Sequence, residues 1–117
     1  MNNNDTNCLT IVIPCFNEKE NISILLHKFR NLLNNRKDCI EVIVIDGGSV
    51  DGTRQELKRI FKELPSDTFS LILGDKNRGY GGDIMYALSK SKGNTLSWTH
   101  SDLQTDPLDV LKAYDLF

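Results

Sequence analysis

The chain has 117 residues, which is enough for one domain with a hydrophobic core and too few for two. Hydrophobic residues make up 39% of it and charged residues 26%, an ordinary globular composition. The formal net charge of -2 gives no electrostatic reason to expect a nucleic-acid partner. No apolar run approaches the roughly 20 residues that a transmembrane helix needs, so we expect no membrane-spanning segment.

The N-terminal residues and the cysteines bear on where the protein works. Residues 1–7 are polar and lack the basic and apolar regions of a signal peptide, so we expect a disordered tail followed by one domain over residues 8–117. Cys8, Cys15 and Cys39 are odd in number and form no Cys-x-x-Cys pair, which argues against a disulfide framework. We therefore expect reduced, partly buried thiols in a cytoplasmic protein.

Four apolar runs alternate with four amphipathic stretches along the chain. The continuous apolar pattern of the runs is typical of strands covered on both faces; they span 9–13, 40–45, 69–73 and 95–99. In the stretches after them, apolar residues recur at spacings of three and four, which predicts helices. This alternation with short connections predicts an α/β fold, with a mostly parallel sheet and helices on both of its faces.

Helix starts are indicated by capping residues. Asn17 is expected to cap the first helix, with Glu20 as its capping-box partner. Asp51 is a favoured capping residue, so we prefer a capping role over a ligand role for it. Asp106 and Pro107 suit the start of the last helix.

Candidate functional residues follow the carboxyl ends of the predicted strands, the edge at which open parallel sheets bind ligands. Asp46 could accept a hydrogen bond from the N–H of a nucleobase, or it could simply hold its own turn. Arg78 could neutralise a diphosphate, although a single Arg in a loop is commonly just solvated. Glycines near these positions would allow the backbone to approach a ligand closely, or they only shape turns: Gly47, Gly48, Gly79, Gly81 and Gly82.

Three polar side chains lie two residues apart after the last apolar run. If the chain stays extended there, His100, Asp102 and Gln104 point the same way. An imidazole, a carboxylate and an amide oxygen suit a divalent ion such as Mn²⁺. The alternative is that Asp102 and Asp106 cap the next helix and His100 hydrogen-bonds a loop, and the spacing does not decide between the two.

Four motifs occur in an order and spacing that resemble those of family 2 glycosyltransferases. They are VIPCFNE at 12–18, VIDGGSVDGT at 44–53, NRGYGG at 77–82 and SDLQTDP at 101–107. The chain is similar to the branch that contains dolichyl-phosphate mannosyltransferases and polyprenyl-phosphate sugar transferases. The resemblance implies the nucleotide-binding part of the Rossmann-like GT-A fold, truncated after the fourth strand–helix unit.

The same resemblance implies a donor site for a UDP- or GDP-linked sugar. Pro14, Phe16 and Glu18 would line the base and ribose pocket, Asp46 would recognise the base, and Arg78 would lie near the diphosphate or sugar. The expected nucleotide-sugar site comprises Pro14, Phe16, Glu18, Asp46, Gly48, Asp51, Arg78, Gly81, Ser101 and Asp102. Mn²⁺ or Mg²⁺ would be held by Asp102, Gln104 and His100. The sequence departs from the family at His100, which replaces the first Asp of the D-x-D element, and at Gly47, where many relatives have a second Asp.

The implied activity is inverting transfer of the sugar to an acceptor that the sequence does not identify, such as a polyprenyl phosphate or a cell-surface glycan. That places the protein in cell-wall or polysaccharide biosynthesis, peripheral at the cytoplasmic face of a membrane, with a homo-oligomer as one option. The family's acceptor region and catalytic base would lie beyond Phe117, so we expect this chain to bind a nucleotide more readily than to turn over. A non-catalytic nucleotide-binding or assembly module is the alternative. A receiver-like or flavodoxin-like domain is disfavoured because Pro14, Cys15 and Phe16 stand where a receiver needs acidic residues.

Overall fold

Four strands and four helices alternate along the chain, as the hydrophobic pattern predicts. The structure is a computed structural model, and it describes residues 8–74, 79–93, 95–98 and 107–115. The elements are β1 (Cys8–Cys15), α1 (Lys19–Leu33), β2 (Cys39–Asp46), α2 (Thr53–Phe61), β3 (Phe69–Leu73), α3 (Gly79–Ser89), β4 (Thr95–Trp98) and α4 (Pro107–Asp115). None of the helices within these ranges is both long enough and apolar enough to span a bilayer.

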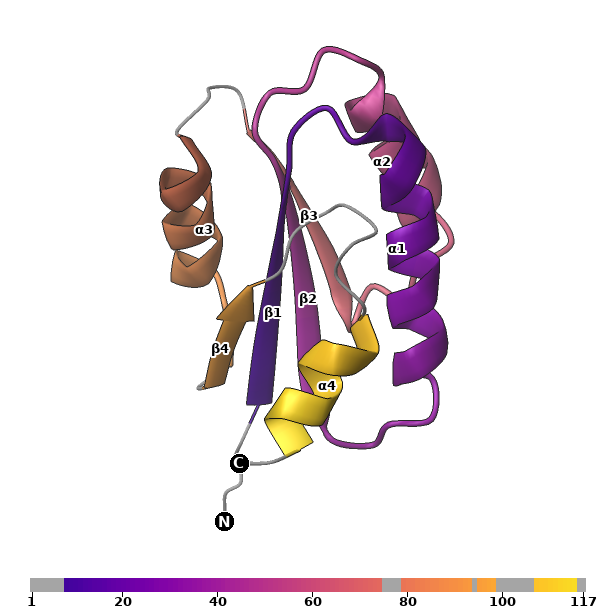
Figure 1. Cartoon of the computed structure of the whole chain (residues 1–117), viewed down its shortest axis with the longest axis vertical. Helices are drawn as coiled ribbons and strands as arrows, with labels where there is room; N and C mark the ends of the chain where they lie inside the picture. Colours follow the sequence, from indigo (N-terminus) through magenta and orange to yellow (C-terminus); the bar gives the residue numbers. More distant parts are fainter. Residues whose placement is uncertain (1–7, 75–78, 94, 99–106, 116–117) are drawn as a thin grey trace.

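The strands form one parallel sheet in the order β3-β2-β1-β4 (Figure 1). From β1 the chain steps outward to β2 and β3, and then crosses back to place β4 on the other side of β1. The direction of travel therefore reverses between β1 and β4. In open parallel sheets, ligands bind outside the carboxyl ends of the strands at such a reversal.

Apolar side chains on the two faces of the sheet pack against different helices. On one face, residues of β1 and β2 such as Ile11 and Val44 pack with α1, α2 and α4. On the other face, Val12 and Ile45 pack with α3 through Ile84. Because helices cover both faces, the central strands are mostly apolar, which is why they appear in the sequence as hydrophobic runs; Thr10 and Glu41, near the amino ends of β1 and β2, are exceptions.

The helix starts differ from the expected caps. α1 begins at Lys19, and the residue before it, Glu18, makes no side-chain capping bond. Asn17 is not the cap: it has a left-handed backbone, with a φ of 54°, and its side chain bonds the neighbouring turn instead. α3 begins at Gly79, so the glycines of the expected turn form the first turn of this helix.

The amino-terminal end of the sheet corrects the prediction of reduced thiols. Cys8 and Cys39 face each other at the first position of the β1–β2 pairing, with their Cα atoms 4.6 Å apart, and they form a disulfide. Cys15, at the opposite end of β1, is buried and lies outside this disulfide. Strand register brought the two cysteines together, and the number and spacing of cysteines carry no information about register. The argument for a cytoplasmic location from reduced thiols is therefore lost.

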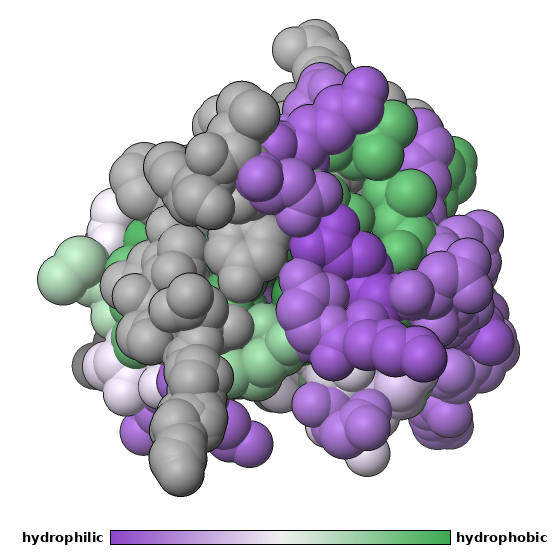
Figure 2. All heavy atoms as spheres, turned by 90° about the horizontal axis from the view of Figure 1, so that it is seen from below, coloured by the Kyte–Doolittle hydropathy of each residue, from purple (hydrophilic) through white to green (hydrophobic). Residues whose placement is uncertain are grey.

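Hydrophilic side chains gather on one side of this amino-terminal end of the sheet (Figure 2). Figure 2 looks onto it from below and shows hydrophilic side chains gathered on the side of α1 and α2. The connection after α1 contributes Arg36, whose guanidinium pairs with Asp38 at 2.6 Å and with Asp115 of α4 at 2.9 Å. These two carboxylates raise the pKa of Arg36, and the guanidinium in turn lowers the pKa of Asp38.

Candidate functional site

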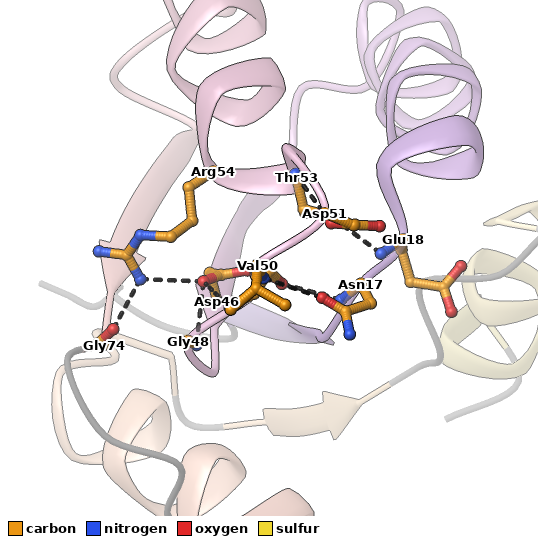
Figure 3. Close-up of polar contacts among 10 residues, drawn as sticks. Asn17, Glu18, Asp46, Gly48, Val50, Asp51, Thr53, Arg54 and Gly74 are labelled. Carbon is orange, nitrogen blue, oxygen red and sulfur yellow. Dashed lines mark hydrogen bonds and ion pairs between the residues drawn. The ribbon is translucent and has the colours of Figure 1, made fainter.

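Two turns at the carboxyl edge of the sheet are joined into one unit. The turn after β1 donates the backbone N–H of Asn17 to Ser49 Oγ at 2.8 Å and that of Glu18 to Thr53 Oγ1 at 2.9 Å. In return, the turn after β2 donates the N–H of Val50 to Asn17 Oδ1 at 3.0 Å (Figure 3). Each bond joins a backbone amide to a side chain of the other turn, so the two turns hold one another in place.

Asp46 lies at the base of the second turn and is fully buried. Its Oδ2 accepts the backbone N–H groups of Gly48 and Ser49, each at 3.0 Å, and Ser49 Oγ donates to Oδ1 at 2.5 Å. Arg54 Nη1 pairs with Oδ2 at 2.9 Å and also donates to the carbonyl oxygen of Gly74 at 2.6 Å. Three of these contacts are made to Oδ2 and one to Oδ1, and all four hold the turn or the adjoining start of α2. The geometry therefore favours the turn-holding role for Asp46.

Asp51 stabilises the start of α2. Its Oδ1 accepts the backbone N–H of Thr53 at 3.0 Å and also the Thr53 hydroxyl, while Oδ2 accepts the N–H of Lys19 at 3.4 Å. The bond from the Thr53 hydroxyl is the main cause of the lowered pKa of Asp51. Gly52, with a φ of 101°, occupies the N-cap position itself, so Asp51 acts from one residue before the cap. These contacts favour the structural role over the ligand role.

The remaining expected site residues within the described ranges are Pro14, Phe16, Glu18, Gly48 and Gly81. Pro14 is buried, and Phe16 is 51% exposed, which leaves its ring accessible. The side chain of Glu18 accepts a bond from Asn21 Nδ2 at 3.3 Å, and Figure 3 shows its carboxylate directed away from the Asp46 turn. Gly48 has a φ of 95°, a conformation that side chains disfavour, and Gly81 is exposed on α3.

Several expected residues lie outside the described ranges. They are Arg78 and the four polar residues after β4, His100, Ser101, Asp102 and Gln104. Over the part of the chain that the structure describes, no group of three His, Cys, Asp or Glu side chains is placed to hold a metal ion. β4 ends at Trp98, opposite Val12 of β1, so residues 99–106 follow a strand that neighbours β1.

Sequence reasoning missed three residues that build the site. Thr53 bonds both turns, and Arg54 neutralises Asp46 from the first turn of α2. Asp83 of α3 is 5% exposed, and its Oδ2 lies 2.6 Å from the place where a Cβ on Gly47 would be. The Asp-x-Thr spacing of residues 51 and 53 is a usable signal for Thr53, whereas no spacing rule marks Arg54 or Asp83.

A cavity of about 450 Å³ lies beside the second turn, towards α2. Ser49 and Val50 border it, and half of its eight lining residues are charged: Lys19, Arg54, Glu56 and Arg59. A lining of this kind suits water or small ions better than a flat, largely apolar base. The cavity therefore adjoins the unit of two turns without identifying what the unit binds.

Residues 10–117 match the family model described as Glycosyl transferase family 2. The chain belongs to this family. It is 31% identical to a dolichyl-phosphate beta-glucosyltransferase of Mus musculus, over 92% of this chain and 35% of the relative. It is also 31% identical to an undecaprenyl-phosphate 4-deoxy-4-formamido-L-arabinose transferase of Aeromonas hydrophila, over 94% of this chain and 33% of the relative. The chain thus spans about a third of the length of these curated relatives.

A solved structure supports the fold of this family 2 chain. The mannosyltransferase PcManGT from Pyrobaculum calidifontis, determined in complex with GDP-Man and Mn²⁺, superposes with a TM-score of 0.72 and 26% identity. The match covers 80% of this chain and 27% of that one. The architecture is therefore that of the N-terminal part of GT-A glycosyltransferases, as the sequence motifs predict.

Proposed function

We propose that this chain forms the donor-binding part of a glycosyltransferase that uses a UDP- or GDP-linked sugar. The observation that carries the proposal is the unit of two turns at the carboxyl edge, held together by the bonds that Ser49 and Thr53 accept from the backbone of the first turn. This unit lies at the strand ends next to the reversal in strand order, in a chain that belongs to family 2. The complex of PcManGT with GDP-Man supports a nucleotide sugar as the ligand.

The residues of the first turn are proposed to contact the base and ribose. The exposed ring of Phe16 offers a flat apolar face against which a base or ribose can pack. Pro14 and Glu18 flank it, one buried and one half-buried. Arg78 supplies the positive charge that a diphosphate needs, and a guanidinium matches the geometry of phosphate oxygens well.

The turn after β4 is proposed to hold a divalent ion. His100, Asp102 and Gln104 offer an imidazole nitrogen, a carboxylate and an amide oxygen, a donor set that fits Mn²⁺ better than Mg²⁺. When bound, such an ion offsets the negative charge that develops on the departing nucleoside diphosphate. The Mn²⁺ in the PcManGT complex supports this assignment.

A polyprenyl phosphate is the acceptor we favour over a glycan. Both curated relatives described above are named for a polyprenyl-phosphate acceptor, dolichyl phosphate in one and undecaprenyl phosphate in the other. Such an acceptor is a membrane lipid, so the activity would take place at a membrane surface. The inverting transfer itself, and this location, are part of the proposal.

A thermal-shift screen of the 117-residue chain tests the donor site. We expect UDP or GDP to raise the melting temperature in Mn²⁺ and to lose most of that effect in chelator, since a ligand at 100 times its dissociation constant stabilises by about 2.7 kcal/mol. Asp102→Ala should abolish the dependence on Mn²⁺, whereas Asp109→Ala, an exposed carboxylate on α4, should not. Absence of stabilisation by every nucleoside diphosphate would refute the proposal. Release of UDP or GDP from sugar nucleotides would separate a working donor site from a non-catalytic nucleotide-binding module.

A further inference from the structure

The cavity beside the second turn has no role in the function derived so far. Its volume of about 450 Å³ lies within the range of natural ligand sites. Ser49 and Val50 of the second turn border it, but none of the residues expected at the nucleotide-sugar site is among the described residues that line it. The cavity therefore adjoins the proposed donor site without being part of it.

The charged side chains in the cavity are mostly cationic. Lys19, Arg54 and Arg59 line it together with a single carboxylate, that of Glu56. Arg59 binds this carboxylate through Nε at 3.1 Å and Nη2 at 2.7 Å. The bond from Arg59 is the main cause of the lowered pKa of Glu56, and the charge of Lys19 adds to it. Glu56 is thus already neutralised by one arginine, and the lining as a whole has an excess of positive charge.

The ammonium group of Lys19 has no ion-pair partner among the described residues. The side chain lies over Gly52 at the start of α2, with Nζ 3.5 Å from the place where a Cβ on that glycine would be. The bond that Asp51 accepts from Lys19 comes from the backbone N–H. Lys19 therefore brings to the cavity a positive charge that no described carboxylate balances.

Arg54 has hydrogen-bond donors to spare for a ligand. Its Nη1 pairs with Asp46 Oδ2 at 2.9 Å and donates to the carbonyl oxygen of Gly74 at 2.6 Å (Figure 3). A guanidinium carries five N–H donors, and the described residues offer Nε and Nη2 no acceptor. An anion in the cavity can therefore bind Arg54 while Nη1 keeps its hold on the second turn.

We propose that this cavity is an anion-binding site that takes a phosphate group, supplied either by inorganic phosphate or by a lipid headgroup. Phosphate oxygens accept hydrogen bonds, and the ammonium and guanidinium groups of Lys19, Arg54 and Arg59 are matching donors. Since a water molecule occupies about 30 Å³ in the liquid, the cavity is large enough for a phosphate and a group attached to it. The site is separate from the donor site, so phosphate and a nucleoside diphosphate should bind together.

Titration with inorganic phosphate at constant ionic strength, followed by backbone amide shifts, tests the site. We expect saturable shifts centred on Lys19 and residues 49–59. Lys19→Gln removes a charge without leaving a carboxylate unpaired, and it should weaken phosphate binding about threefold, as expected for an exposed ion pair. Adding Arg59→Gln should bring the loss to about tenfold. Lys28→Gln is the matched control, because this exposed lysine lies about 13 Å further along α1, beyond the Debye length of about 8 Å.

Vesicles distinguish the two sources of phosphate. If the group is a lipid headgroup, the chain should sediment with vesicles of phosphatidylglycerol and not with vesicles of phosphatidylcholine. The double variant of Lys19 and Arg59 should then lose this retention, and Lys28→Gln should keep it. Saturable binding of inorganic phosphate without retention on either vesicle would instead assign the site to a soluble phosphate.

The contrary outcomes are equally specific. Equal phosphate affinity in wild type and the double variant, or displacement of phosphate by UDP or GDP, would place the phosphate elsewhere and overturn the inference. The inference also fails if phosphate binding does not saturate and the charges of Lys19 and Arg59 have no effect on vesicle retention. If wild type binds phosphate in this cavity and no nucleoside diphosphate, the proposed function fails and the anion site stands.

Discussion

The two ends of the sheet are stabilised in different ways. At the amino-terminal end, a disulfide joins β1 to β2, and Thr10 Oγ1 donates to Glu41 Oε1 at 2.6 Å. Gly93 packs so closely on Thr10 that a Cβ there would lie 2.2 Å from the hydroxyl oxygen. Thr10 Oγ1 and Glu41 Oε1 also accept the backbone N–H of Gly93, at 3.0 and 3.2 Å. At the carboxyl end, the turns are likewise held by side chains that accept backbone N–H groups, but the bonds that join them are hydrogen bonds and not a disulfide. The amino-terminal end therefore has a covalent link in addition to its hydrogen bonds, whereas hydrogen bonds join the two turns at the carboxyl end.

This difference separates stability from function within one small domain. The disulfide fixes the first residues of β1 and β2 relative to one another, but it offers a ligand no hydrogen-bonding group. A turn held by side-chain acceptors fixes the direction of its own amides and carboxylates, which a binding site requires. Variants at the amino-terminal end should therefore change stability alone, whereas variants at the carboxyl end should also change the order of the turns or nucleotide binding. Four sets of variants test this.

Opening the disulfide should have the largest effect on stability. The Cys8–Cys39 link closes a segment with a sequence separation of 31, for which loop-closure entropy gives about 3–4 kcal/mol. Urea unfolding with and without reductant, and of Cys39→Ser, should show this loss while the nucleotide dissociation constant stays the same. If reduction weakened nucleotide binding as much as it lowered the unfolding free energy, the two ends would not have separate roles.

Removing the charge of Asp46 should come next. Asp46→Asn leaves Arg54 without its carboxylate, and breaking a buried pair costs about 3–5 kcal/mol; since the Arg54 side chain is 26% exposed, we expect about 3 kcal/mol. Unlike the disulfide variant, it should also weaken nucleotide binding, because the second turn loses its support. Asp109→Asn on α4 should change stability by less than about 0.5 kcal/mol. Wild-type affinity in a destabilised Asp46→Asn would show that the turn's order is not needed for binding.

Thr53→Val should have a smaller effect. The substitution keeps the shape of the side chain but removes the acceptor for the Glu18 N–H, and an unsatisfied amide of this kind costs about 1–3 kcal/mol. Since the bond joins the two turns, we expect faster amide exchange at residues 17–19 as well as a lower unfolding free energy. Thr68→Val, at the opposite end of the sheet, is the matched control. Equal exchange rates in Thr53→Val and wild type would contradict the joined unit.

The pH dependence of Asp51 should be the smallest of the four effects. Its folded-state pKa is lowered, so its contribution to stability is fully present above the unfolded pKa of about 3.9 and is lost as pH falls through the folded value. The melting temperatures of wild type and Asp51→Asn should therefore differ by a constant amount at neutral pH and converge below about pH 4. A difference that instead grew on acidification would reverse the assigned sign.

The sequence predicts the architecture well because the fold depends on hydrophobic patterning. Strands buried on both faces are mostly apolar, and that pattern locates β1 to β4 within one or two residues. Motif order was sufficient to identify the family. The contacts of the site are harder to predict from the sequence, because its hydrogen bonds join residues of different turns that are far apart along the chain.

Three examples show what patterning cannot supply. Asn17 has the composition of a helix cap, but the turn after β2 offers its side chain a better partner in the N–H of Val50. Cys8 and Cys39 form a disulfide only because register sets them opposite one another. Asp83 reaches the site from a helix on the far face of the sheet. Each is a long-range contact, and none follows from local spacing.

Mapping backbone amide shifts by nuclear magnetic resonance during titration with UDP and GDP, in Mg²⁺, tests the central claim most directly. The account predicts shifts concentrated at residues 14–19 and 46–54 and small changes at Cys8, Cys39 and Glu41. Shifts that instead centred on the disulfide end, with the two turns unchanged, would contradict it.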